Sequence, residues 1–561
     1  MAGGSIAGKG QDAVRKIPAS SEERPMTLTD HIRADDLMAL DALRRGLGED
    51  RVLADAKTRE YYANDIFWQP GIPPLAVALP QTAAEAAAAV RLATEQGLSV
   101  VPRGGGMSYT KGYLPERADS VVIDLRKLDR VVEVNADDLY VTVEAGCTWE
   151  KLNAALADTG LRTGYWGPLS GVNATVGGAL SQNSAFFGSA LSGTVADSVL
   201  GVTVVLADGT LVTTGSGGRT GAKPFTREGG PDLTGLFLGD NGAFGVKVAA
   251  TLRLWPRPAE AGYLSFGFGS MQAMAAAQVE MARTRLVAEG FGIDRTKAEH
   301  SASVNRISDG LKALGAVANS GKSLLEGVKS AAAVAAAGAN FLKAHAYTLH
   351  IVAEATDEAQ LRKGLATLSA IGRRHGVEIQ NSVPMVMRAK PFGPVRGMLG
   401  LNGERWVPIH AVFPLGEAQR VVDANERFFA EQRPIMERHG IVYSVMSMTV
   451  GAEFFLEPAF YWRDEITPLH AASVGHEVVK PWLDRPANEE ARAAVAQLRR
   501  ATQDLYVSLG GVSWQVARDY PFASVLKPET LALLQALKRA VDPNDLMNPG
   551  SLGLRRGGAA G

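Results

Sequence analysis

The chain has 561 residues, more than one hydrophobic core normally serves, so we expect at least two domains. Apolar residues make up 46% of it and charged residues 21%, a balance typical of globular proteins that excludes a largely disordered chain. The formal net charge of -1 gives no electrostatic reason to expect nucleic acid as a partner.

Cysteine content and the apolar runs exclude further classes of protein. Cys147 is the only cysteine, which excludes an intramolecular disulfide and a CxxC metal site, and its neighbouring glycine favours a small buried residue over a reactive thiol. Residues 1–25 are polar and Gly-rich, so we expect a flexible N-terminus that is not a secretory signal. No uncharged apolar run reaches the roughly 18 residues of a membrane span. We therefore predict a cytoplasmic protein without an integral membrane span.

Helices and strands alternate from residue 26 to about residue 258. The pattern is helical up to Gln69, and a strand is predicted at residues 74–80. Thr82, with Glu85 three residues later, predicts the start of an Ala-rich helix that ends at Gly97. A second helix is predicted from Thr148. Further strands are predicted at residues 98–102, 120–125, 131–135, 140–146, 199–209 and 209–215, the last two joined by a hairpin at Asp208-Gly209.

Two prolines in TLRLWPRP, residues 251–258, mark a change in the character of the chain. Residues 259–500 show alternating strands and long helices, and we place a domain boundary before them. Residues 501–561 form a C-terminal segment that contains a helix followed by a loop rich in Pro, Asn and Gly.

The stretch VVPRGGGMSYTKGYLP, residues 100–115, carries three consecutive glycines after a strand. Glycines expose backbone N–H groups and let an anion approach closely, which favours a phosphate or pyrophosphate site, although plain turns use such triplets too. Neither GxxxxGK[ST] nor a helix-opening GxGxxG is present, so a P-loop and an NAD-binding Rossmann domain are disfavoured.

Three further stretches accompany this loop: residues 167–183, 230–256 and 541–550. In order and spacing, the four together resemble the FAD-binding domain of the vanillyl-alcohol oxidase/p-cresol methylhydroxylase (PCMH) family, over roughly residues 52–258 and 517–552. The resemblance implies an α+β fold. It would consist of a two-part PCMH-type FAD-binding domain (residues 26–258, completed by residues 501–561) and a central cap, or substrate, domain with an antiparallel sheet (residues 259–500).

The resemblance also implies FAD as the cofactor. Many relatives attach the flavin covalently through a histidine of the first loop, where this chain has Met107 and Ser108. We therefore favour non-covalent FAD. The residues expected to bind it are Pro102, Arg103, Gly104, Gly105, Gly106, Met107, Ser108, Pro168, Gly171, Thr175, Gly177, Gly178, Asn183, Gly242, Gly245, Val246 and Asn548.

Four residues are candidates for catalysis. Relatives that oxidise 2-hydroxy acids carry a GEHGxG-like segment suited to a metal, whereas residues 510–524 contain no histidine, so no metal is expected. Arg518 and Tyr520 of this segment could lower the pKa of a phenol, or serve as surface and core residues. In the cap, His410 is a candidate general base and Tyr443 a candidate ligand for a substrate hydroxyl, with hydrogen-bonded core roles as the alternative.

These observations lead to a preferred function and two alternatives. The preferred function is two-electron oxidation of an aromatic or phenolic alcohol by an FAD-dependent enzyme, and the first alternative is dehydrogenation of a 2-hydroxy acid or sugar alcohol. The second alternative is a flavin-fold protein that binds a ligand without turnover. The expected partners are a small-molecule substrate and an electron acceptor, either a protein or O2, and a homodimer is left open.

Overall fold

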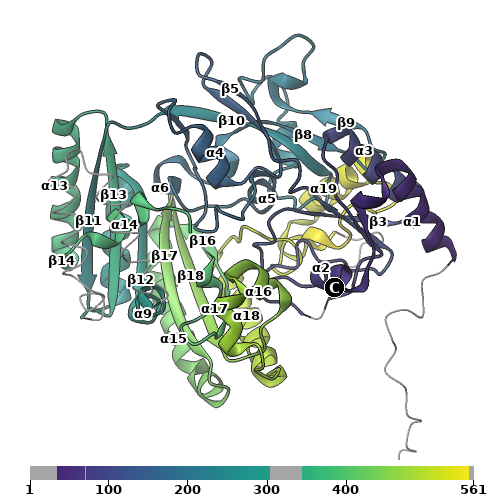
Figure 1. Cartoon of the computed structure of the whole chain (residues 1–561). Helices are drawn as coiled ribbons and strands as arrows, with labels where there is room; N and C mark the ends of the chain where they lie inside the picture. The colour runs from purple at the N-terminus through teal and green to yellow at the C-terminus, as the bar shows by residue number, and fades with distance from the viewer. Residues whose placement is uncertain (1–33, 70, 304–343, 394, 555–561) are drawn as a thin grey trace, which may run out of the picture.

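A computed structural model describes residues 34–69, 71–303, 344–393 and 395–554 of the chain. The N-terminal segment expected to be flexible lies outside these ranges. Mixed helices and sheets give the expected α+β class. The N-terminal part of the chain forms one half of the molecule, and the cap forms the other half (Figure 1).

The first sheet has four strands in the order β1-β2-β4-β3, and β2, β4 and β3 run parallel. Strands β2 and β4 are fully buried, as expected for apolar runs with cover on both faces. Thr82 caps the helix that follows β2, since its hydroxyl accepts a hydrogen bond from Glu85 N at 3.1 Å. The strands are β1 (Val52–Leu53), β2 (Ala76–Ala78), β3 (Ser99–Arg103) and β4 (Ser120–Asp124).

The second sheet is antiparallel and centres on one long strand, β10, which pairs with β6, β7 and β8. The predicted hairpin at Asp208-Gly209 joins β8 to β9, with Gly209 in the left-handed region at φ 83°. The strands are β5 (Val131–Asn135), β6 (Tyr140–Glu144), β7 (Leu161–Thr163), β8 (Val199–Val205), β9 (Leu211–Thr213) and β10 (Val246–Pro256).

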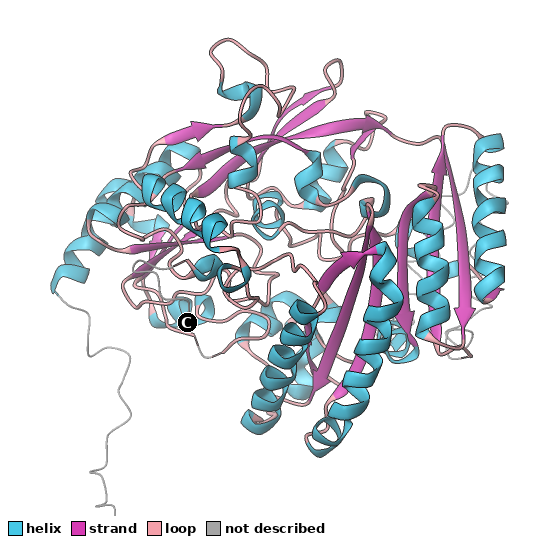
Figure 2. Cartoon of the chain, turned by 180° about the vertical axis from the view of Figure 1, so that it is seen from behind, coloured by secondary structure: helices cyan, strands magenta, loops and turns pink. Residues whose placement is uncertain are grey.

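The third sheet is the antiparallel sheet of the cap, in the order β14-β11-β13-β12-β17-β18-β15 with β16 beside β18. Helices α8 (Met271–Arg283), α13 (Glu358–His375) and α15 (Ala418–Arg438) pack on one of its faces (Figures 1 and 2). The strands are β11 (Glu260–Phe268), β12 (Val287–Asp294), β13 (Tyr347–Ala355), β14 (Val377–Ile379), β15 (Arg405–Pro408), β16 (Ala411–Pro414), β17 (Val442–Val450) and β18 (Glu453–Trp462).

The remaining helices cover the sheets and connect them. Within the described ranges, none has the length and hydrophobicity that a membrane crossing requires. These helices are α1 (Ala34–Leu47), α2 (Ala56–Tyr62), α3 (Ala83–Glu95), α4 (Trp149–Ala155), α5 (Val176–Gln182), α6 (Ser189–Ser192), α7 (Leu233–Leu236), α9 (Arg295–Ser303), α14 (Ser382–Ala389), α16 (Pro468–Val474), α17 (His476–Val479), α18 (Glu489–Ser508) and α19 (Pro528–Val541).

The C-terminal segment returns to the first half of the chain, where it is drawn in yellow beside the purple elements (Figure 1). Val100 N donates to Leu546 O, and Asn548 N donates to Val100 O, both at 2.8 Å, so this segment extends the edge of β3. The expected end of the cap at residue 500 falls inside α18, a continuous helix that packs against β18 and α15.

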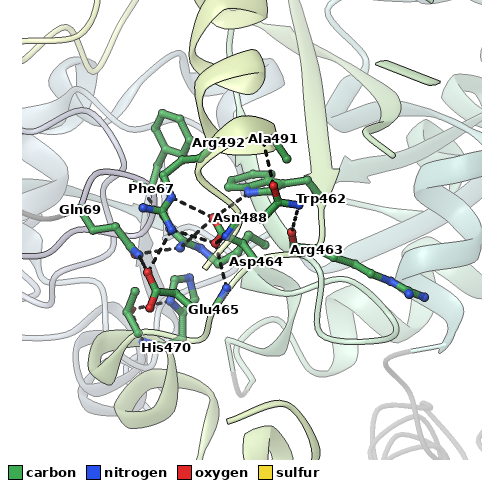
Figure 3. Close-up of polar contacts among 12 residues, drawn as sticks. Phe67, Gln69, Trp462, Arg463, Asp464, Glu465, His470, Asn488, Ala491 and Arg492 are labelled. Atoms are coloured by element: carbon green, nitrogen blue, oxygen red, sulfur yellow. Dashed lines mark hydrogen bonds and ion pairs between the residues drawn. The ribbon is translucent and has the colours of Figure 1, made fainter. Parts of the chain in front are cut away.

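A buried polar network joins the cap to the segment after α2 (Figure 3). The Arg405 guanidinium donates to Gln69 Oε1 at 2.8 Å and to the carbonyl of Phe67 at 2.9 Å. Asp464 lies 3.9 Å from this guanidinium and accepts a hydrogen bond from Arg492 at 2.8 Å. Because Arg405 and Asp464 are both fully buried, this network fixes the two halves of the molecule against each other.

Candidate active site

A cavity of about 530 Å3 has walls from the loop after β3, from the glycine-rich segment around α5 and from the cap. Two motifs that are far apart in the sequence therefore meet at one site. The expected FAD-binding residues that line it are Pro102, Arg103, Gly104, Gly105, Gly106, Met107, Ser108, Pro168, Thr175, Gly177, Gly178 and Gly245.

The loop after β3 presents unpaired amides to this cavity. In the part of the chain that the structure describes, the backbone N–H groups of residues 104–109 donate no hydrogen bond to another protein group. Buried backbone donors normally have a partner, so this row of amides is suited to an anion that is not part of the chain.

Gly104 and Gly105 of this loop are required by a close approach of two loops. A Cβ on Gly104 would lie 2.3 Å from Thr175 Oγ1, and one on Gly105 would lie 1.8 Å from the carbonyl oxygen of Asn173. The sequence suggested that the glycines are bare for a pyrophosphate. In the structure, the missing side chains make room for the neighbouring loop, and this contact holds the unpaired amides at the cavity.

Arg103 adds a positive charge beside these amides. Arg103 is 2% exposed, and its guanidinium lies 4.6 Å from the ring centroids of Tyr62 and of Tyr113. Among the described residues, no carboxylate forms an ion pair with it. A buried guanidinium held by aromatic rings, next to unpaired amides, fits the diphosphate of FAD.

Five residues expected to bind FAD do not line the cavity, and they have structural roles instead. A Cβ on Gly171 would meet Phe392, and Gly242 lies beside Pro102 with φ 77°. Asn183 ends α5 in the left-handed region, and Val246 begins β10 in the core. Asn548 donates to the carbonyls of Gly112 and Asn241 and so ties the C-terminal segment to the first loop.

The cap side of the cavity is one face of β17 and β18. On β18, Phe455, Glu457 and Tyr461 line the cavity, while the alternate residues Phe454 and Leu456 pack under the helices. On β17, Met446 and Met448 line it and pair with Glu457 and Phe455 respectively.

Lys297 of α9 supplies a cation to this wall. Its ammonium donates to the Tyr461 hydroxyl at 3.3 Å and lies 5.0 Å from the centroid of the Trp406 ring. Burial favours a lower pKa for Lys297, but the neighbouring Tyr461 and Glu457 outweigh it and raise the pKa above its ordinary value. The ammonium therefore stays charged at neutral pH.

Glu457 supplies a carboxyl that titrates near neutral pH. Burial raises its pKa to about 7, and the charge of Lys297 limits that rise. A carboxyl with this pKa on a cavity wall is suited to general acid–base chemistry. The sequence reading missed both Glu457 and Lys297. The signal for Glu457 was its charge in an otherwise apolar strand, FFLEPAFYW.

His410 and Tyr520 do lie together, but neither lines the cavity. The Tyr520 hydroxyl is 3.0 Å from His410 Nδ1 and accepts a hydrogen bond from the His410 backbone N–H. Phe455 stacks on the His410 ring and itself lines the cavity. Burial lowers the pKa of His410 to about 3. Neither this pKa nor its position outside the cavity lining supports the predicted role as a general base near neutral pH.

Tyr443 and Arg518 also lie outside the lining of the cavity. Tyr443 is on the face of β17 that packs under the helices, where its hydroxyl accepts from Asn425 at 3.0 Å and its ring stacks on Phe429. Arg518 donates to the carbonyls of Leu114 and Pro549, each at 2.9 Å. Arg518 therefore joins the C-terminal segment to the first loop, and contact with substrate is not supported for either residue.

The described residues offer neither a reactive thiol nor a metal-binding cluster. Cys147 is buried with its pKa raised by burial to about 11, which confirms the expected unreactive thiol. No cluster of three or more His, Cys, Asp or Glu side chains suited to a metal ion occurs in the ranges that the structure describes.

Comparison with known proteins identifies the cofactor domain. A family model described as an FAD binding domain matches residues 74–215, and the model for the C-terminal domain of FAD linked oxidases matches residues 520–552. The first of these segments contains the glycine loop, and the second contains Asn548, which donates a hydrogen bond to the Gly112 carbonyl just after that loop. FAD is therefore the cofactor of this chain.

Curated relatives share parts of the sequence. The chain is 30% identical over 250 residues to mitochondrial D-lactate dehydrogenase (cytochrome) 1 of Saccharomyces cerevisiae, covering 43% of this chain and 41% of that protein. It is 28% identical over 260 residues to D-2-hydroxyglutarate dehydrogenase of Xanthomonas citri pv. viticola, covering 45% and 52%. The chain thus aligns with about half or less of the length of these relatives.

Solved structures share the whole fold. The 4-ethylphenol oxidase of Gulosibacter chungangensis, in its isoeugenol complex, superposes with a TM-score of 0.69 at 17% identity, covering 95% of this chain and 99% of that one. Substrate-bound p-cresol methylhydroxylase gives 0.69 at 16% identity, covering 93% and 97%. The matched FAD domain makes this chain an FAD-linked oxidoreductase, and its fold is the one that the resemblance to the vanillyl-alcohol oxidase/p-cresol methylhydroxylase family implied.

Proposed function

We propose that this protein is an FAD-linked dehydrogenase that oxidises a 2-hydroxy acid to the 2-oxo acid. The observation that carries the proposal is that a cation, Lys297, and a carboxyl with a raised pKa, Glu457, both line the FAD cavity. The curated relatives named for D-lactate and D-2-hydroxyglutarate favour this substrate class over the phenolic alcohol preferred from the sequence.

The residues that would hold FAD are those of the glycine loop. The amides of residues 104–109 and the Arg103 guanidinium would bind the diphosphate, and Gly177 and Gly178 would lie along the cofactor without side chains. Bound FAD supplies a two-electron acceptor for a hydride. This chain's own residues must then bind the acid and remove a proton.

Lys297 and Glu457 can divide these two tasks. Conversion of R–CH(OH)–COO⁻ to R–CO–COO⁻ removes a hydride from the carbon and a proton from the hydroxyl. The Lys297 ammonium would pair with the substrate carboxylate, and the ionised Glu457 would accept the hydroxyl proton. Trp406 and Tyr461 flank the ammonium and would shield its pair with the substrate from water.

Anaerobic bleaching of the flavin tests the proposal. We expect D-lactate or another D-2-hydroxy acid to bleach the FAD of the purified protein. Lys297→Met should lower kcat/KM for the acid about 30-fold, because it removes a charge-assisted hydrogen bond to the substrate carboxylate. The FAD content of the variant should be unchanged. The control Lys363→Met removes an exposed lysine of α13 and should leave kcat/KM unchanged. If no 2-hydroxy acid bleaches the flavin, the proposal is wrong.

A second candidate function rests on the aromatic lining of the cavity. Trp406, Tyr461 and Trp514 all contribute to the wall, and an aromatic alcohol would pack against them. Lys297 and Tyr461 would then stabilise a phenolate. Bleaching by para-hydroxybenzyl alcohol alone would favour this function, and bleaching by no alcohol at all would favour a binding protein without turnover.

Three accompanying predictions stay open to experiment. The electron acceptor is proposed to be a protein or O2. Whether the protein forms a homodimer can be tested by measuring its mass in solution. A cytoplasmic location also stays a prediction, since relatives from Saccharomyces cerevisiae and Danio rerio are described as mitochondrial.

A further inference from the structure

The cap wall of the cavity changes from charged to apolar along β18. Glu457 and Tyr461 lie toward one end, next to Lys297, and Phe455 lies toward the other. A strand advances about 7 Å over two residues, so the Cα positions of Phe455 and Glu457 are about 7 Å apart on the same face. A substrate that meets Glu457 with its hydroxyl can therefore extend a side chain toward Phe455.

The apolar end is built from both halves of the molecule. Met448 pairs with Phe455 across the strands, and the Trp514 ring stacks on Phe455 with a centroid distance of 6.0 Å. Phe186, from the segment after α5, also lines the cavity and packs in the same apolar cluster. His410 behind Phe455 is uncharged at neutral pH, because burial lowers its pKa to about 3.

We infer that the substrate is a 2-hydroxy acid with an apolar arylalkyl side chain, of the chemical class of 3-phenyllactate. This inference rests on the proposed function and narrows it. The carboxylate pairs with Lys297, the hydroxyl meets Glu457, and the aryl group packs between Met448, Phe455 and Trp514. Lactate would leave the apolar end without a partner, and the second carboxylate of a hydroxy diacid would lose its hydration there.

Kinetics on a matched pair of acids test the inference. Each methylene removed from water improves binding about fourfold, so a phenyl group should improve kcat/KM for D-3-phenyllactate over D-lactate at least thirtyfold. Trp514→Ala should lower this ratio about tenfold. Trp514 is only partly buried, and FAD content and the unfolding midpoint of the variant report whether it folds. The control Trp255→Ala removes a half-exposed ring of β10 outside the cavity and should keep the ratio.

Binding without turnover gives an independent readout. Isothermal titration of the FAD-loaded protein should give a Kd for 3-phenylpropanoate at least thirtyfold below that for propanoate. Equal kcat/KM for the two hydroxy acids, or equal Kd for the two analogues, overturns the inference and leaves the proposed function standing. Failure of every 2-hydroxy acid to bleach the flavin overturns the proposed function itself.

Discussion

At the scale of single residues, burial decides which titratable groups can act at neutral pH. Burial raises the pKa of Glu457 to about 7 and lowers the pKa of His410 to about 3. The carboxyl thus exchanges protons in the physiological range, whereas the imidazole is neutral throughout it. His410, which lies between β15 and β16, was the candidate base from the sequence, but the neighbouring strand β18 carries Glu457, the group with the suitable pKa.

The pH dependence of flavin reduction tests Glu457. A base must be ionised, so kcat/KM should rise as the pH rises through about 7 and then level off. Glu457→Gln should remove this rise, the pH-dependent limb of the profile. It should also slow flavin reduction about 100-fold at pH 8, which is the lower end of the usual contribution of a general base. Stopped-flow reduction under anaerobic conditions measures both effects.

A matched control separates the loss of a base from a change in the strand. Glu453→Gln alters a carboxyl at the start of the same strand that does not line the cavity, and it should preserve the rate and the limb. If Glu457→Gln retains the rise near pH 7, another group is the base.

At the scale of elements, the two glycine-rich segments act as one unit. Gly105→Val would place a Cβ 1.8 Å from the Asn173 carbonyl oxygen, and backbone cannot yield that distance without moving the whole loop. We expect the purified variant to lose bound FAD, as measured by the ratio of flavin to protein absorbance. Gly416→Ala is the control, since its added Cβ meets no atom within 4 Å. Full FAD occupancy in Gly105→Val would contradict the loop assignment.

Local patterns predicted the elements well, because each of them reports on its own neighbourhood. Thr82 and Glu85 start α3, and Asp208-Gly209 forms its hairpin, since caps and turns depend on residues a few positions apart. Tyr443 was a candidate ligand for a substrate hydroxyl with a core role as the alternative, and the structure places it on the core face of β17. The packing of α8 and α15 decides that question, and that packing is not local.

The candidate site depends on the same distant contacts. Lys297 lies on a short helix and reaches the cavity only because α9 packs against β17, so nothing near it in the sequence marked it. The glycine loop, by contrast, was recognisable from its own residues and its order relative to three other motifs. Cofactor binding was therefore easier to predict than substrate binding.

At the scale of the whole molecule, the cavity depends on how the cap sits against the FAD domain. Buried Arg405 and Asp464 and partly buried Arg492 lie at this contact, and Figure 3 labels Asp464 and Arg492 in the network. Asp464 is the shared acceptor. It takes hydrogen bonds from Arg492 at 2.8 Å and 2.9 Å and from the Trp462 indole at 3.0 Å. Burial favours a higher pKa for Asp464, but these donors outweigh it and lower the pKa below its ordinary value.

Asp464→Asn should loosen the whole contact, because it removes the carboxylate beside the fully buried Arg405 and leaves the partly buried Arg492 with Glu465 alone. Removal of one partner from a buried ion pair costs about 3–5 kcal/mol, so the unfolding midpoint in denaturant should fall and FAD should dissociate at lower denaturant concentration. Asp504→Asn changes an exposed carboxyl on α18, the helix that also carries Arg492, and should shift neither. An Asp464→Asn protein that unfolds at the wild-type midpoint would show that the hydrogen bonds from Arg405 to Gln69 and Phe67 hold the cap without help from the charge pair.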